Sequence, residues 1–106
     1  ATLQRIDGME PSDRALALKV HEIALKVNPD FVVKTWYGMP AYYQDGQVVL
    51  FFQDGHKFKT RYSTVGFQQA ARLDSGSFWP TSYAITGFDR LVEEQLAELI
   101  KQALGR

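Results

Sequence analysis

The sequence predicts an α+β domain of order α-β-β-β-β-β-α, in which the two terminal helices pack on one face of an antiparallel five-stranded sheet. Amphipathic stripes stand near both ends of the chain, and the segment between them is rich in Val, Phe, Tyr, Trp and Thr, which suit a pleated surface. Two Asp-Gly dipeptides in that segment favour tight antiparallel turns. A chain of 106 residues has room for one core, so residues 1–106 are expected to form a single domain.

The first helix is predicted over residues 12–28. Its apolar side chains recur at three- and four-residue steps and form one stripe: Leu16, Val20, Ile23, Ala24 and Val27. Pro11 and Ser12 supply start signals, and Pro29 disfavours helical geometry at Asn28. The stripe is expected to face the sheet.

The middle of the chain is expected to form a meander. Strands are predicted at about 31–37, 41–44, 47–53 and 57–64, with a fifth in 79–86. Asp45-Gly46 and Asp54-Gly55 are the expected hairpin turns. Strand 47–53 carries apolar side chains on both faces, so we expect it to be central, with part of its second face in contact with something else.

The predicted strand 57–64 alternates between two kinds of side chain. Phe58, Thr60, Tyr62 and Thr64 would lie on a buried side, and Lys57, Lys59, Arg61 and Ser63 on a wet side. Residues 65–76 are expected to be a single turn or an irregular connection. Asp89 is expected to cap the last helix and Gly105 to end it, with this apolar stripe between them: Val92, Leu96, Leu99, Ile100, Ala103 and Leu104.

Composition excludes several classes of site. Lys plus Arg and Asp plus Glu number 12 each, so the net charge of zero disfavours nucleic acid as a partner. There are no cysteines, which excludes a thiolate metal site or a cysteine nucleophile and fits a cytoplasmic protein. No stretch approaches the roughly 20 apolar residues that cross a bilayer, so no membrane contact is expected. His21 and His56 have no partner at a motif spacing, and no catalytic motif is present, so the protein is not expected to be an enzyme.

Several segments together resemble the YdhG-like family of bacterial domains of unknown function. They are "WYGMPAY", "DGQVVLFFQ", "KFKTRYSTVGF", "WPTSYAIT" and the terminal amphipathic helix, and Tyr37-Gly38-Met39-Pro40 is the most recognisable motif. The resemblance implies an α-β-β-β-β-β-α fold likened to frataxin, and for some members an iron-chaperone function.

An iron-binding function would need several exposed carboxylates, because hard cations prefer oxygen ligands. The first helix lacks an acidic ridge, since its Asp13 and Glu22 are balanced by basic residues. Glu94 and Glu98 stand one turn apart on the last helix and are the candidate metal ligands of this alternative, with iron as the possible cofactor. A solvated helix face explains the same two residues.

The preferred hypothesis is a non-catalytic module that binds a small ligand or a protein partner on the open face of the sheet. Its candidate ligand-binding residues are Trp36, Tyr37, Met39, Tyr43, Lys57, Lys59 and Arg61. A rigid Gly38-Met39-Pro40 turn would hold the aromatics around a cleft, and the basic row would meet an anion. Core packing of the aromatics and a solubilising strand face are the alternatives. The protein is expected to be a monomer, or a homodimer through the sheet if the exposed apolar area is large.

Overall fold

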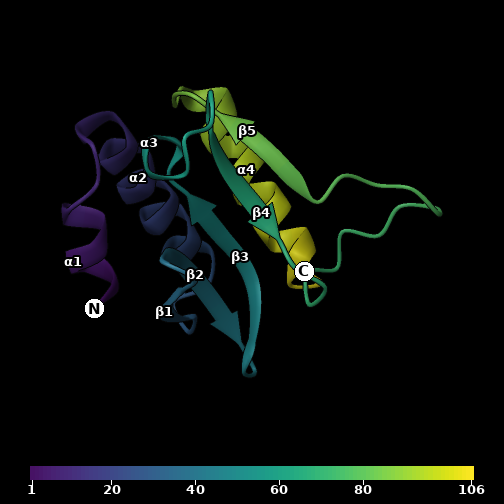
Figure 1. The fold of residues 1–106 in the computed structure, drawn as a ribbon. Helices are drawn as coiled ribbons and strands as arrows, with labels where there is room; N and C mark the ends of the chain where they lie inside the picture. The colour runs from purple at the N-terminus through teal and green to yellow at the C-terminus, as the bar shows by residue number, and fades with distance from the viewer.

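The computed structural model describes residues 1–106 as an α+β domain with an open five-stranded antiparallel sheet in the order β1-β2-β3-β4-β5 (Figure 1). The elements are α1 (Thr2–Asp7), α2 (Pro11–Val27), β1 (Val32–Trp36), β2 (Met39–Gln44), β3 (Gln47–Gln53), α3 (Gly55–Phe58), β4 (Ser63–Phe67), β5 (Ser82–Ile85) and α4 (Arg90–Ala103). The predicted α+β class and the five antiparallel strands are confirmed. The predicted order lacks two short helices, α1 and α3.

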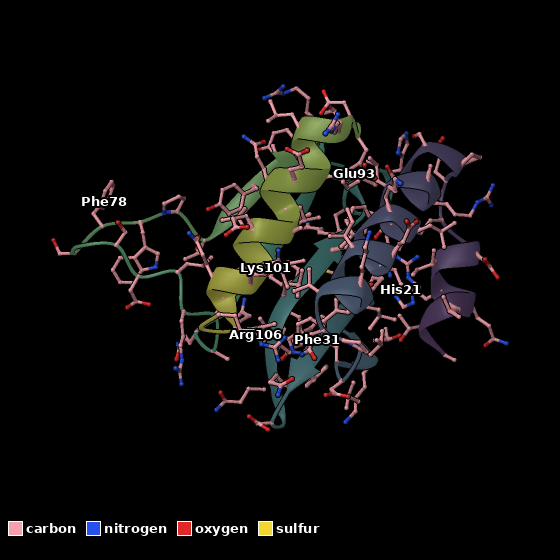
Figure 2. All side chains as sticks on the ribbon, turned by 180° about the vertical axis from the view of Figure 1, so that it is seen from behind. His21, Phe31, Phe78, Glu93, Lys101 and Arg106 are labelled. Carbon is pink, nitrogen blue, oxygen red and sulfur yellow. The ribbon has the colours of Figure 1, made fainter.

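The long helices α2 and α4 lie side by side on one face of the sheet, behind it in Figure 1 and in front of it in Figure 2. The Glu10 carboxylate caps α2 by accepting from the next amides. Asp89 caps α4 by accepting from the Val92 amide at 2.9 Å, as predicted, and Gly105, with φ of 77°, follows its end. None of the helices is both long and apolar enough to cross a membrane.

The core lies between these helices and one face of the sheet. Tyr42, Leu50 and Phe67 stand in register on β2, β3 and β4, and all three are buried. Phe52 and Val65 form the next buried pair on the same face. They join the apolar stripes of α2 and α4 in one hydrophobic cluster. The central position predicted for β3 is confirmed.

The strand predicted at 57–64 is wrong. Residues Gly55–Phe58 form one helical turn, α3, and Lys59 follows in the left-handed region with φ of 58°. A Cβ on Gly55 would lie 2.8 Å from the carbonyl oxygen of Tyr62, so only glycine allows the chain to return this closely. The fourth strand begins at Ser63 instead and continues to Phe67, where the sequence predicts a single turn or an irregular connection.

The connection between β4 and β5 runs over residues 68–81 and projects away from the rest of the molecule (Figures 1 and 2). Phe78 lies at its far end and is 94% exposed. The fifth strand is shorter than predicted and covers only Ser82–Ile85. Trp79 and Pro80 therefore precede the strand.

Candidate functional site

The face of the sheet that points away from α2 and α4 carries one continuous row of residues. Lys34, Ala41, Phe51, Gly66 and Ser82 are paired in register from β1 to β5. Because strand side chains alternate between faces, this row lies opposite the buried row that faces the helices. No helix covers this face in Figure 1. We call it the open face.

Three aromatic side chains gather on the open face and its adjoining turn. The Phe51 ring covers Gly66, where an added Cβ would lie 2.1 Å from the ring carbon Cζ. Trp36 packs on Phe51 with ring centroids 5.4 Å apart, and Tyr37 packs edge-on against Trp36 at 4.9 Å. We call Trp36, Tyr37 and Phe51 the aromatic patch.

The turn that holds the patch differs from the predicted Gly38-Met39-Pro40 turn. Its two residues are Tyr37, with φ of 50°, and Gly38, with φ of 77°, as in a primed hairpin turn. Met39 and Pro40 lie in β2 instead and are buried, and Met39 is paired in register with Trp36, so its side chain is not open to a ligand. A left-handed tyrosine costs about 1–3 kcal/mol, and Tyr37 as a whole stays 80% exposed. Burial does not explain why a tyrosine occupies this position.

Replacing Tyr37 by asparagine is expected to raise the free energy of unfolding by about 0.5–1 kcal/mol, because asparagine tolerates the left-handed region. Urea unfolding measures the change. The matched control is Asp45→Asn at the corresponding position of the second hairpin, where φ is 52°, and it should change stability by less than about 0.5 kcal/mol. A less stable Tyr37→Asn variant would show that the contact with Trp36 outweighs the backbone strain.

Charge is distributed unevenly over the sheet. The five strands contain no Asp or Glu, and Lys34 is their only Lys or Arg. The Lys34 ammonium lies 5.2 Å from the centre of the Tyr43 ring. Lys57 reaches from α3 to the turn, where a Cβ on Gly38 would lie 2.6 Å from its Nζ atom. Neither lysine forms a salt bridge, so the open face and its adjoining turn carry two positive charges without a carboxylate partner.

A shallow hollow of ≈ 490 Å³ adjoins the patch. It is lined by Trp36, Gln47, Val48, Gln68, Gln69 and Ala70. The glutamine amides offer hydrogen-bond donors and acceptors beside a flat indole surface. A second hollow, of ≈ 180 Å³, lies between β5 and α4 and is lined mainly by apolar side chains without any charged group. It lacks the convergent polar groups that orient a ligand, so the open face is the better candidate.

Long-range polar contacts hold α3, and with it Lys57, in place. The buried Asp13 carboxylate accepts from the backbone N–H of His56 at 2.9 Å, and its Oδ2 atom lies 2.9 Å from His56 Nδ1. Its Oδ1 atom accepts from the Ser63 hydroxyl at 3.2 Å, and that hydroxyl accepts from the Gly55 N–H. These contacts tie α3 to the first turn of α2 and to the start of β4.

The two histidines are expected to give opposite pH dependences. The hydrogen bond to Asp13, helped by the charges of Asp13 and Glu10, raises the pKa of His56 above 6.5. Burial lowers the pKa of His21, whose Nδ1 atom lies 2.9 Å from the Tyr42 hydroxyl. Figure 2 shows His21 on the helix-covered side of the molecule. Burial also raises the pKa of the Tyr42 phenol, so this hydroxyl stays protonated and shares a hydrogen bond with the neutral His21 ring.

His56 contributes stability that is fully present below the unfolded-state pKa of 6.5 and is lost as the pH rises through its higher folded-state pKa. His21 acts in the opposite sense, because its folded state resists protonation, and stability is lost as the pH falls below 6.5. Urea unfolding in EDTA between pH 5 and 8 should therefore show that His56→Gln is relatively most destabilising at pH 5, whereas His21→Gln gains stability relative to the wild type at pH 5. Equal pH profiles for all three proteins would contradict both assignments.

The remaining predicted site residues lie apart from one another. Tyr43 is half-buried beside Lys34, but Lys59 and Arg61 are exposed in the segment that follows α3. The predicted basic row of Lys57, Lys59 and Arg61 does not form, because α3 and the left-handed Lys59 replace the strand.

The candidate metal ligands of α4, Glu94 and Glu98, do not belong to a group of three metal-ligating side chains. Glu94 accepts from Arg90 at 3.1 Å, and Glu98 is exposed. The single group of three metal-ligating side chains in the chain is Glu10, Asp13 and His56. Sequence reasoning missed this group because 43 residues separate Asp13 from His56.

The chain matches no family model, no curated protein and no solved structure. The YdhG-like resemblance therefore stays a prediction.

Proposed function

We propose that this protein is a non-catalytic binding module whose open face takes a small planar anion, such as an aromatic carboxylate. One observation carries the proposal: the open face holds a partly exposed aromatic patch and the Lys34 ammonium, Lys57 reaches the adjoining turn, and the strands contain no carboxylate. Trp36 and Tyr37 offer flat surfaces, and Lys34 and Lys57 offer positive charge.

Aromatic stacking and the lysine charges are expected to contribute similar amounts to the binding free energy. Stacking of a planar group on an aromatic side chain is worth about 1–3 kcal/mol. A charge-assisted hydrogen bond from a lysine adds about 1.5–3 kcal/mol where water is excluded, and less on an open surface. Affinity for a simple compound should be modest, because a ligand of 13 heavy atoms at about 0.3 kcal/mol per atom reaches a Kd on the order of 1 mM.

We also propose that the protein is a YdhG-like domain and that it is cytoplasmic. Two helices on one face of an antiparallel five-stranded sheet support a YdhG-like, frataxin-like domain. The absence of cysteine supports a cytoplasmic protein. The alternative iron-chaperone function gains no support from α4, where Arg90 holds Glu94.

Three matched compounds test the function by ligand-observed NMR titration. 2-Naphthoate has a flat ring and a charge, 2-naphthamide has the ring without the charge, and cyclohexanecarboxylate has the charge without the flat ring. Naphthoate should bind at least about 5-fold more tightly than either analogue, since each lacks one of the two contributions.

Two variants assign the contributions to residues. The Lys34→Gln, Lys57→Gln double variant should lose about 10-fold in affinity for naphthoate and little for naphthamide, because only the charge contact is removed. Arg90→Gln, which removes a distant exposed cation on α4, is the control. Equal affinities of the three compounds, or an unchanged double variant, would overturn the proposal and favour a protein partner or a second copy on this face.

A further inference from the structure

A second polar site lies at one end of the sheet, where the first turn of α2 meets α3. Glu10, Asp13 and His56 each offer one metal-ligating atom, and all three atoms lie within 4.8 Å of one another. We call these residues the carboxylate–histidine cluster. The ligand-binding proposal for the open face does not use it.

The spacing of the three atoms suits a metal ion. Ligands about 2.1 Å from a metal lie about 3.0 Å apart at adjacent octahedral positions and about 3.4 Å apart at tetrahedral ones. His56 Nδ1 lies 2.9 Å from Asp13 Oδ2 and 3.1 Å from Glu10 Oε2. An ion could therefore enter with only small movements of these side chains.

The cluster is held by a second layer of hydrogen bonds, as metal ligands generally are. The Ser63 hydroxyl donates to the other oxygen of Asp13. Glu10 Oε2 accepts from the Ser12 hydroxyl and from the backbone N–H groups of Ser12 and Asp13, so these contacts fix the Glu10 carboxylate as the N-cap of α2. Asp13 Oδ2 also accepts the backbone N–H of His56 and keeps a second lone pair. Asp13 is buried, whereas the His56 side chain is 61% exposed, so the cluster opens to solvent on the histidine side. Water could complete the coordination there.

The local charge also favours a divalent cation. With a neutral imidazole, the cluster carries two negative charges. The N-terminus of α2 contributes only about half a positive charge. The nearby Arg5 guanidinium is already matched by Asp54, with its Nη2 atom 3.0 Å from both carboxylate oxygens. These groups together carry a net charge of about −1.5.

We propose that Glu10, Asp13 and His56 form a binding site for a divalent transition-metal ion, with a Glu10 carboxylate oxygen, Asp13 Oδ2 and His56 Nδ1 as the protein ligands. One imidazole with two carboxylates suits Zn²⁺, Co²⁺ or Mn²⁺ better than Ca²⁺ or Mg²⁺, which prefer all-oxygen sites. The ion replaces the Nδ1 proton, which is released to solvent. The site fastens α3 to α2 by coordination in place of the His56–Asp13 hydrogen bond.

A titration of the protein with Co²⁺ alone tests the site, because the visible absorption of bound Co²⁺ reports nitrogen and oxygen coordination. One equivalent is expected to bind. Glu10→Gln and His56→Gln should each weaken Co²⁺ binding at least about 10-fold. Asp13 is left intact because it is buried and supports the fold.

Two controls keep the outcome unambiguous. His21→Gln, at the other histidine, and the Glu94→Gln, Glu98→Gln double variant should bind Co²⁺ like the wild type. Urea unfolding in EDTA checks that each variant is folded. If Co²⁺ binding survives both cluster substitutions, or is lost in the α4 double variant instead, the proposed site is wrong. Naphthoate binding to metal-free protein is measured separately, so failure here leaves the open face untouched.

Discussion

Replacing Phe52 by alanine is expected to lower the free energy of unfolding by about 3–5 kcal/mol without weakening ligand binding to the folded protein. Phe52 is fully buried on β3, opposite Val65 and within the cluster shared with the helices. Its removal leaves a cavity in a core that a domain this small cannot readily close. If Phe52→Ala does not fold, Phe52→Leu leaves a smaller cavity and serves in its place.

Replacing the neighbouring Phe51 by alanine should have the opposite pair of effects, a small loss of stability and a clear loss of ligand binding. Phe51 is half-buried on the open face, so Phe51→Ala should cost only about 1–2 kcal/mol. It should, however, weaken naphthoate binding at least about 5-fold, because Trp36 loses the ring against which it packs. Urea unfolding and NMR titration of both variants measure the two effects. If Phe51→Ala and Phe52→Ala lost the same amount of stability and the same amount of naphthoate affinity, β3 would not be divided into a core face and a binding face.

Replacing Arg5 by alanine is expected to lower the free energy of unfolding by about 2–4 kcal/mol. The Arg5 Nη2 atom lies 3.0 Å from both oxygens of Asp54, whose side chain is 3% exposed. Without the guanidinium, a buried carboxylate remains without its counter-charge. Urea unfolding at pH 7 measures the loss.

A second substitution separates this electrostatic effect from lost packing of α1. The Arg5→Ala, Asp54→Asn double variant should regain at least about 1 kcal/mol over Arg5→Ala, because a neutral amide is less costly to bury than a charge. If the double variant is no more stable than Arg5→Ala, the contribution of Arg5 lies in its packing. The pair matters for the site because Asp54 directly precedes α3, which carries Lys57.

Local signals in the sequence predict much of the fold. The spacing of Leu16, Val20 and Ile23 marks the buried side of α2, and Asp89 caps α4 as expected. Asp45-Gly46 forms the predicted hairpin turn, with both residues at positive φ. These features depend on residues close together in the chain, so a single sequence contains the information needed to find them.

The errors arise where distant contacts override a local pattern. Alternation over 57–64 favours a strand, but Asp13 binds the backbone of His56, and the Ser63 hydroxyl binds that of Gly55, so a helical turn forms instead. The α1 helix is missed because six residues with a single buried apolar side chain, Ile6, give no periodic signal.

The candidate sites were predictable to different extents. Period-2 alternation in β3 indicates a second apolar face, and Trp36 and Tyr37 stand out by type, so the region of the open face is found from sequence. The approach of the Lys57 side chain to Gly38 depends on α3, so it could not be found from the sequence. The carboxylate–histidine cluster joins the start of α2 to α3 through the fold, and no motif spacing indicates it.

The measurement that tests the open face most directly is protein-observed ¹H–¹⁵N NMR during a titration with 2-naphthoate. The two tryptophans, Trp36 and Trp79, give separate indole signals, and a Trp79→Phe variant assigns them. We expect the Trp36 indole signal and the amide signals of Lys34, Gly38 and Gly66 to shift in a saturable way, while the amide signals of α4 do not move. Shifts confined to α4, to the loop around Phe78 or to no residue at all would contradict this expectation.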